Sequence, residues 1–367
     1  MANLVLRDVW KSYGKVQALQ GVEFACRDGE FFCLLGPSGA GKTTTLKVIA
    51  GVEQPDRGEI LLDGQSIVET PPQLRDVALA FESYALYPQL TVFENLAFPL
   101  RAPLRARQYT KEEVERRVRE VASLLNIGEL LDRLPRELSG GQRQRVGLGR
   151  VLVRRPKVYL LDEPIAHLDA KLRHRMRGEL KKIQAELGIT TVYATPDQLE
   201  ALSMADTIAV INQGRIEQIG PPEEIYGRPG NVFVAQFVGD PPMNILPARV
   251  LGDKLVVEAE CYFELPISPQ DQALLQAKVR NGRVKVGIRP KDIVFTSCEA
   301  DGLHSVGEVE EVETLGQTTV VTLIVGCLRL KTKVPTLEAP TRGDKVGIVL
   351  HTDQLHYFDA ETDRRLA

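Results

Sequence analysis

The stretch that decides the fold is GPSGAGKT, residues 36–43. It follows the apolar run FFCLL at 31–35 and opens TTTLKVIAG, a segment with the composition of a helix. Glycines let such a loop turn its backbone N–H groups toward one point, and the start of a helix adds positive potential there. The stretch therefore predicts a phosphate-binding loop between a strand and a helix.

Individual residues of this loop have predicted roles. Lys42 is expected to reach the terminal phosphates of a nucleotide, and the Thr43 hydroxyl is expected to bind Mg²⁺. A chance glycine-rich turn is the alternative, and a second motif downstream makes it a minor one. The residues predicted to surround the phosphates are Gly36, Pro37, Ser38, Gly39, Ala40, Gly41, Lys42, Thr43 and Thr44.

The second motif is VYLLDEP, residues 158–164, an apolar run that ends in acids. Such a run is typical of a buried parallel strand. Asp162 is expected to hold Mg²⁺, and Glu163 to polarise an attacking water. Acids at the end of a strand often only meet solvent or cap a helix, which is the plainer interpretation. The presence of the phosphate loop favours the functional one.

Strands and helices alternate through the first two thirds of the chain. Short apolar runs at 3–62 indicate strands, and 111–126 places Val114, Val118, Val121, Ala122 and Leu125 on one face of a helix. Further strands are expected at TTVYAT and TIAVINQG, after a helix that ends at Gly188. This alternation predicts an α/β P-loop NTPase fold around a parallel sheet.

The character of the sequence changes near residue 240, at the proline-rich stretch VGDPPMNILPARV. Short β-like runs separated by turn residues follow it, which predicts a small all-β barrel. We therefore expect an ATPase-type domain at 1–238, with a helical subdomain at approximately 88–155, and a second domain at 239–367.

Composition excludes several other classes of protein. The chain has 367 residues and a net charge of −3, so no strongly basic surface indicates a nucleic-acid partner. No apolar run approaches the roughly 18 residues of a membrane span, and the N-terminus lacks the pattern of a secretion signal. The five cysteines are scattered without a C-x-x-C pair, so we expect buried free thiols rather than zinc or disulfides.

A third motif, LSGGQRQRV at 138–146, lies between the first two. Ser139 is expected to cap a helix whose first residues, Gly140 and Gly141, expose backbone N–H groups. The stretch resembles the signature motif of ABC (ATP-binding cassette) ATPases. The resemblance implies ATP as the nucleotide, and a head-to-tail pair in which each ATP lies between one chain's phosphate loop and the other chain's signature. Its implied nucleotide contacts are Ser139, Gly140, Gly141 and Gln142.

Other positions match the family one at a time. Tyr13 stands where the family has an aromatic that stacks on adenine, although a lone tyrosine is more often a core residue. Arg133 matches a position that contacts nucleotide from the opposite chain. Asp169 matches the aspartate of the D-loop, which signals between the two ATP sites.

The remaining sequence narrows the resemblance. VGIRPKDIVF and VEEVETLGQTTVV resemble the TOBE-type, OB-like domain of sugar-importer ATPases related to the maltose-transporter ATPase, and 81–100 resembles their Q-loop region. The resemblance implies a peripheral subunit at the cytoplasmic face of the inner membrane. It implies a second ATPase subunit and two membrane permeases as partners, an extracellular solute-binding protein acting indirectly, and a sugar, polyol or glycerol-type solute.

Two positions depart from the family's pattern at its chemistry. Glu82 replaces the Q-loop glutamine, and although a carboxylate can still ligate Mg²⁺, it adds negative charge. Pro196 replaces the histidine that contacts the γ-phosphate, and losing such a group typically costs about 10²–10⁴-fold in rate. His167, in the D-loop, stands at an asparagine-like position and is not expected to compensate.

This pattern of losses suggests a chain that is one of two unlike ATPase subunits, with a degenerate ATP site of its own and an intact signature that serves its partner. A homodimer with altered catalysis is the main alternative. A soluble ABC ATPase of DNA repair or translation, or a nucleotide-regulated binding module without catalysis, is a weaker one.

Overall fold

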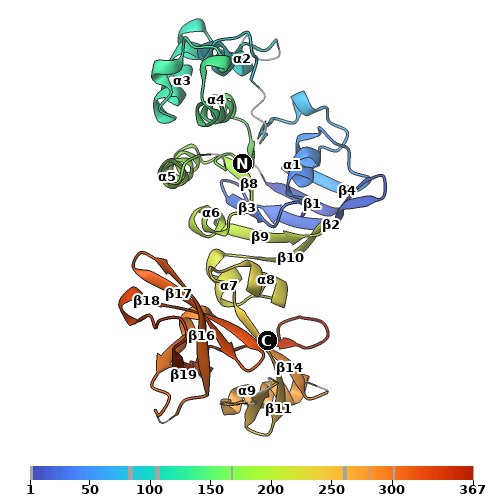
Figure 1. Cartoon of the computed structure of the whole chain (residues 1–367). Helices are drawn as coiled ribbons and strands as arrows, with labels where there is room; N and C mark the ends of the chain where they lie inside the picture. The colour runs from blue at the N-terminus through green and yellow to red at the C-terminus, as the bar shows by residue number, and fades with distance from the viewer. Residues whose placement is uncertain are drawn as a thin grey trace. The chain divides into compact units, whose positions relative to one another are not determined.

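The computed structural model describes residues 3–81, 86–103, 108–166, 168–258, 263–279, 281–300 and 302–366 (Figure 1). The chain forms two compact units, Met1–Pro222 and Glu223–Ala367. Among the described helices, none has both the length and the apolar character needed to cross a membrane.

The first unit contains two sheets. An antiparallel sheet has the order β2 (Val16–Cys26), β1 (Leu4–Tyr13), β4 (Arg57–Leu62) and β5 (Gln65–Ser66). A six-stranded sheet has the order β10 (Arg215–Gly220), β9 (Thr207–Asn212), β3 (Phe31–Leu35), β8 (Thr190–Thr195), β7 (Val158–Asp162) and β6 (Val77–Ala80). Its strands are parallel except for the antiparallel pair β9 and β10.

The parallel strands are continuous apolar runs because both of their faces are covered. Every residue of β3, β7 and β8 is buried. Helix α1 (Lys42–Ala50) covers one face, where Leu46 and Ile49 share a core with residues of both sheets. Helices α5 (Ala170–Leu187) and α6 (Gln198–Met204) lie on the other side of the sheet (Figure 1). The α/β core expected from the sequence is confirmed.

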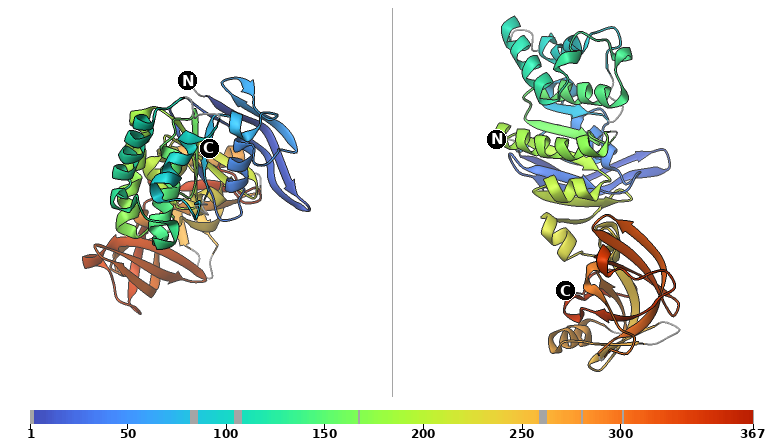
Figure 2. Two further views of the ribbon diagram at one scale, coloured as in Figure 1. Left: turned by 90° about the horizontal axis from the view of Figure 1, so that it is seen from above. Right: turned by 60° about the vertical axis from the view of Figure 1, so that its left-hand side comes forward.

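Helices α2 (Val92–Arg101), α3 (Lys111–Leu124) and α4 (Gly140–Leu152) form a group at one end of this unit (Figures 1 and 2). Helix α3 buries Val114, Val118 and Ala122, as its pattern predicts. Gly149 of α4 allows the close packing, since a Cβ atom there would lie 2.6 Å from Leu96.

The second unit is built on two antiparallel sheets that share one core. The first has the order β13 (Phe263–Pro266), β12 (Lys254–Val257), β11 (Asn244–Leu251), β14 (Arg283–Ile288) and β20 (His356–Asp359). The second has the order β15 (Ile293–Thr296), β19 (Lys345–Leu350), β16 (Ser305–Leu315), β17 (Thr318–Val325) and β18 (Leu328–Pro335).

The second unit consists mostly of strands, which confirms the expectation from the sequence, and it also contains short helices. Helix α9 (Pro269–Lys278) begins where Ser268 caps the backbone N–H of Asp271 and proline occupies the first helical position. Serine followed by proline is a recognised helix start, so the sequence carried this signal. Two further helices, α7 (Pro222–Gly227) and α8 (Val232–Phe237), precede β11.

A buried arginine explains why residues 223–238 pack with the second unit, although the change in sequence character comes at residue 239. Arg289 is 2% exposed and follows β14. Its guanidinium donates to the backbone oxygens of Tyr226, Ala235 and Val238, and its Cζ lies 4.2 Å from the Tyr226 ring centroid. One cation thus satisfies the carbonyls at the ends of α7 and α8.

The thiols also differ from expectation. Cys26 and Cys33 are buried, and burial raises the pKa of both. Cys298 and Cys327 are exposed, because both lie beside turns rather than in core strands. Cys261 lies outside the described residues.

His356, at the start of β20, makes the second unit sensitive to acid. Burial lowers its pKa from 6.5 to about 4, assisted by Arg365 and Arg289. The unfolded chain therefore binds a proton that the folded chain excludes, so stability is present above pH 6.5 and is lost as pH falls toward 4. The loss amounts to about 3 kcal/mol at most.

We expect His356→Gln to remove this component of acid sensitivity, since glutamine does not titrate. Hydrogen exchange of the β14 and β20 amides in the full chain, corrected for its intrinsic pH dependence, measures the effect between pH 7 and 4.5. His351→Gln, which changes an exposed histidine of the same unit, is the matched control. Equal acid sensitivity in the His356 variant and the unaltered chain would contradict this account.

Candidate functional site

The phosphate loop lies at the carboxyl end of β3, where the parallel strands of the sheet end together. Its glycines are required by close approach of other backbone. A Cβ atom at Gly36 would lie 2.2 Å from the Ile211 oxygen, and one at Gly41 would lie 2.7 Å from the Ala18 oxygen. Gly41 also has φ of 109°, in the left-handed region that disfavours other residues. The motif predicts glycine at Gly36 and Gly41, and the packing of the folded chain leaves room for no other residue there.

Lys42 is held inside this loop. Its ammonium is 4% exposed and donates to the oxygens of Gly36 (2.9 Å) and Pro37 (3.1 Å). It lies 3.7 Å from the Glu163 carboxylate. Burial lowers its pKa, against the opposing effects of Glu163 and Asp162. The sequence predicted roles for Lys42 and Glu163 separately, and the structure brings them together as an ion pair.

A cavity of ≈ 510 Å³ opens at this loop. It is lined by the loop, the start of α1, the start of β2, Glu163 and Gln213. Tyr13 pairs in register with Val16, one of the lining residues, and is 42% exposed. The Lys11 ammonium lies 5.4 Å from its ring centroid. Tyr13 is thus an exposed residue beside this cavity and not a core aromatic, and its adenine-stacking role stays a prediction.

The two acids lie at the end of β7. Asp162 is 2% exposed, and Glu163 follows it with φ of 46°. Left-handed backbone is uncommon outside glycine and is concentrated at functional sites. The Glu163 N–H donates to the Ala194 oxygen of β8 at 2.9 Å, which fixes this conformation. Its side chain is thereby directed toward Lys42.

The residues at this edge fit a hydrated divalent cation. Mg²⁺ prefers oxygen ligands, and the Thr43 hydroxyl and the Asp162 carboxylate supply them at the loop and at the end of β7. The third predicted ligand, Glu82, lies outside the described residues, so its role stays a prediction.

Pro196 follows β8 at the same edge of the sheet. The Thr195 oxygen before it accepts from the Gly36 N–H at 3.3 Å, so position 196 directly adjoins the phosphate loop. The proline is exposed, and its ring offers no hydrogen-bond donor. Position 196 therefore adjoins the phosphate loop and offers it no side-chain donor.

The signature forms the capped start of α4. The Ser139 hydroxyl accepts from the Gln142 N–H at 3.3 Å, and the Gln142 side-chain oxygen accepts from the Ser139 N–H at 2.8 Å. A Cβ atom at Gly140 would meet nothing within 4 Å, so this helix start is open. The cavity at Lys42 is lined by other elements, so the two predicted phosphate-binding surfaces of the chain are separate. The Gln142 side chain is occupied by its hydrogen bond to the Ser139 N–H.

The other two predicted residues lie in exposed segments outside helices and strands. The Arg133 oxygen accepts from the Val92 N–H at 2.8 Å, and the residue is exposed. Asp169 caps α5 by accepting from the Leu172 N–H at 2.9 Å. His167 lies outside the described residues.

Sequence reasoning missed two polar side chains that join these motifs. Gln144 of α4 is fully buried and donates to the Pro164 oxygen at 2.8 Å, which links the signature helix to the segment after Glu163. Arg173 of α5 contacts the Ala166 and Leu168 oxygens. A glutamine on the buried face of α4, four residues before buried Leu148, was the available signal for the first.

A groove of ≈ 470 Å³ lies between β6 and helices α2 and α4. Tyr87, Phe98 and Arg150 line it. The ring centroids of Tyr87 and Phe98 lie 4.4 Å apart. The Arg150 guanidinium also contacts Tyr87, with its Cζ 4.7 Å from the ring centroid. The groove adjoins Phe81, after which the Q-loop residues begin.

Comparison with known proteins was made for the whole chain. The sequence profile of the ABC transporter family matches residues 19–166, that of the MalK OB fold domain matches 239–293, and that of the TOBE domain matches 286–358. A solved dimeric ATP-binding cassette, in a post-hydrolysis state with ADP and Pi, is similar with a TM-score of 0.55 and 30% identity. It covers 60% of this chain and 98% of its own.

Full-length relatives are also similar. The trehalose/maltose import ATP-binding protein MalK of Thermococcus litoralis is 46% identical, and the sn-glycerol-3-phosphate import ATP-binding protein UgpC of Cereibacter sphaeroides is 43% identical. The sulfoquinovosyl glycerol transport ATP-binding protein SmoE of Agrobacterium fabrum is 41% identical. Each comparison covers 100% of both chains.

Proposed function

The chain belongs to the ABC transporter ATPases that carry a MalK OB fold and a TOBE domain, and on this premise we propose that it couples ATP hydrolysis to the import of a small solute. The solute class is a sugar, a polyol or a glycerol derivative, because similar proteins are named for import of trehalose or maltose and of sn-glycerol-3-phosphate. The chain then works at the cytoplasmic face of the inner membrane, bound to two permease subunits.

One observation carries the proposal: the two phosphate-binding surfaces of the chain are separate. Lys42 and Glu163 form one surface at the end of the sheet, and the capped start of α4 forms the other. Neither encloses a nucleotide by itself. A second ATPase subunit placed head to tail would complete both sites, with the α4 start of each chain facing the phosphate loop of the other.

The roles of the residues follow from their positions. Lys42 neutralises charge on the terminal phosphates, and Tyr13 stacks on the base. Glu163 accepts a proton from the attacking water. Its carboxylate lies 3.7 Å from the Lys42 ammonium, which places it beside the terminal phosphates. Thr43, Asp162 and Glu82 would hold Mg²⁺, which would supply charge stabilisation to the phosphates.

The groove lined by Tyr87, Phe98 and Arg150 is the proposed docking site for the permease subunits. Its lining combines aromatic rings with the cations of Arg150 and Arg154, and it adjoins Phe81, which precedes Glu82. A helix of a permease seated there would move the same segment that contributes to the ATP site. A solute-binding protein outside the cell acts on the permeases rather than on this chain.

We place the chain in a pair of unlike ATPase subunits. The losses, Glu82 and Pro196, both belong to the chain's own ATP site. The signature residues that serve the opposite site keep their capping geometry. A partner with glutamine and histidine at the two altered positions would then hold the faster site, completed by the α4 start of this chain.

A homodimer with altered catalysis is the second candidate, and the ion pair of Lys42 with Glu163 favours it. This chain retains the group that polarises water. Two copies of the chain would then hydrolyse ATP slowly at two equivalent sites.

Turnover assays separate these candidates. The full chain is purified alone and together with a second ATPase subunit that carries glutamine and histidine at the altered positions. ATP hydrolysis and binding of a fluorescent ATP analogue are measured in both. We expect the chain alone to bind nucleotide with little turnover, and the mixture to turn over briskly. Brisk turnover by the chain alone would reject the unlike pair, and failure to bind nucleotide would reject the ATPase proposal itself.

A further inference from the structure

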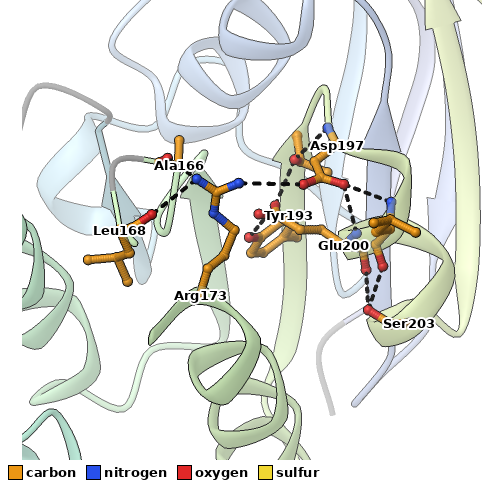
Figure 3. Close-up of polar contacts among 9 residues, drawn as sticks. Ala166, Leu168, Arg173, Tyr193, Asp197, Glu200 and Ser203 are labelled. Atoms are coloured by element: carbon orange, nitrogen blue, oxygen red, sulfur yellow. Dashed lines mark hydrogen bonds and ion pairs between the residues drawn. The ribbon is translucent and has the colours of Figure 1, made fainter. Parts of the chain in front are cut away.

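Arg173, in the first turn of α5, connects two segments that flank the ATP site (Figure 3). Its Nη2 donates to the backbone oxygens of Ala166 at 2.8 Å and Leu168 at 3.1 Å. Its Nη1 lies 3.9 Å from Oδ2 of Asp197, the residue that follows Pro196. A planar guanidinium presents its donors in a fixed fork that can serve two such directions at once.

The Asp197 side of this link is rigid. The second carboxylate oxygen of Asp197 caps α6 by accepting from the Leu199 N–H at 2.8 Å and the Glu200 N–H at 3.3 Å. The Asp197 N–H donates to the Thr195 hydroxyl at 3.0 Å, and that hydroxyl donates to buried Glu200 at 2.7 Å. The backbone on both sides of Pro196 is therefore held by side chains. Figure 3 shows the contacts of Asp197 with Arg173 and Glu200.

The other side of the link leads to Glu163. The Ala166 N–H donates to the Glu163 oxygen at 3.3 Å, and the Leu168 N–H donates to the Ile165 oxygen at 3.3 Å. Asp169, which follows Leu168, caps α5. Displacement of the segment at 166–169 would therefore act on Glu163 through the backbone and on Asp197 through Arg173.

The pair of contacts is not the arrangement that would best satisfy the arginine. The Nε atom of Arg173 is buried without a hydrogen-bond partner among the described residues, and the Nη1 contact of 3.9 Å is an ion pair longer than a hydrogen bond.

We infer that Arg173 is a positioning residue that couples the segment ending at Asp169, which the proposed pairing would place beside the second ATPase subunit, to the segment that carries position 196. The inference rests on the proposed function, because it assigns this coupling to the pairing of two ATP sites. The route uses the side chain of Asp197 and not that of residue 196. It therefore survives in a chain whose residue 196 is proline.

The first test uses the full chain without nucleotide or partner. Hydrogen exchange is measured for the backbone amides at 166–169 and 197–200. We expect Arg173→Gln to speed exchange in both segments, while Arg175→Gln, an equal charge change at an exposed position of the same helix, leaves both unaltered. Faster exchange in only one segment would overturn the inference, because the two would not be coupled. This test does not depend on ATP turnover.

The second test uses the assembled pair of ATPase subunits. We expect Arg173→Gln to lower kcat by about 10- to 100-fold while KM for ATP changes less than about twofold, as misplacement of reacting groups would. Asp197→Asn keeps the cap of α6 but removes the charge, so it should lower kcat similarly. The double variant should lose no more than either single variant, and Arg173→Lys should recover only part of the loss.

The outcomes remain distinguishable. Additive losses in the double variant, an unchanged kcat, or equal changes in KM and kcat would each overturn the coupling role of Arg173. An unaltered pair that does not hydrolyse ATP would instead count against the proposed function, and the exchange experiment would still decide whether the link exists.

Discussion

A double variant, Pro196→His with Glu82→Gln, hydrolyses ATP at least about 10²-fold faster than the unaltered chain when each is assayed without another kind of ATPase subunit. The reason is positional. Residue 196 directly follows β8, whose last residue bonds to Gly36 of the phosphate loop. An imidazole at this place supplies the donor that proline lacks, at a site that already holds Lys42 and Glu163 3.7 Å apart.

The matched control is Pro196→Ala with Glu82→Gln. Alanine restores a backbone N–H and relaxes the constraint on φ, but it adds no donor to the side chain. Turnover is measured as phosphate release by the purified chain at saturating ATP. A gain in the histidine variant that the alanine variant shares would assign the effect to the backbone. No gain in either would contradict the interpretation of position 196 as the lost catalytic contact.

A Gly140→Asp substitution in this chain lowers ATP turnover by the assembled pair by at least about 10²-fold. The carboxylate would stand at the first residue of α4, where the nucleotide of the partner's site is proposed to dock, and would repel its phosphates. The fold should not suffer, because a side chain at Gly140 meets nothing within 4 Å and an acid suits the first turn of a helix.

Two comparisons sharpen this result. Gly140→Ala fills the same open space without charge, so it should retain most of the turnover. Lys42→Ala in this chain weakens nucleotide binding at its own site and should reduce turnover of the pair much less than Gly140→Asp does. If Lys42→Ala proved the more damaging change, this chain's own site would be the active one, and the proposed division of roles would be reversed.

Much of the fold was predictable because its signals are local. A glycine-rich turn after the strand at 31–35, the apolar run that ends at Asp162 and the serine cap of α4 each lie within about ten residues of sequence. The start of α9, at Ser268 and Pro269, is an equally local signal. Local backbone preferences and side-chain caps act over one or two turns, so these elements can be predicted before any packing is known.

The sequence by itself therefore determined the motifs, their order and the substitutions at Glu82 and Pro196. Only the tertiary structure decided which of these residues meet. Lys42 contacts Glu163 across more than a hundred residues, Gln144 reaches Pro164, and Arg173 joins Ala166 to Asp197. Parallel strands bring their carboxyl ends to one edge, and helices packed on both faces fix the side chains there. Contacts of this kind depend on packing between distant segments, which no periodicity within a single segment encodes.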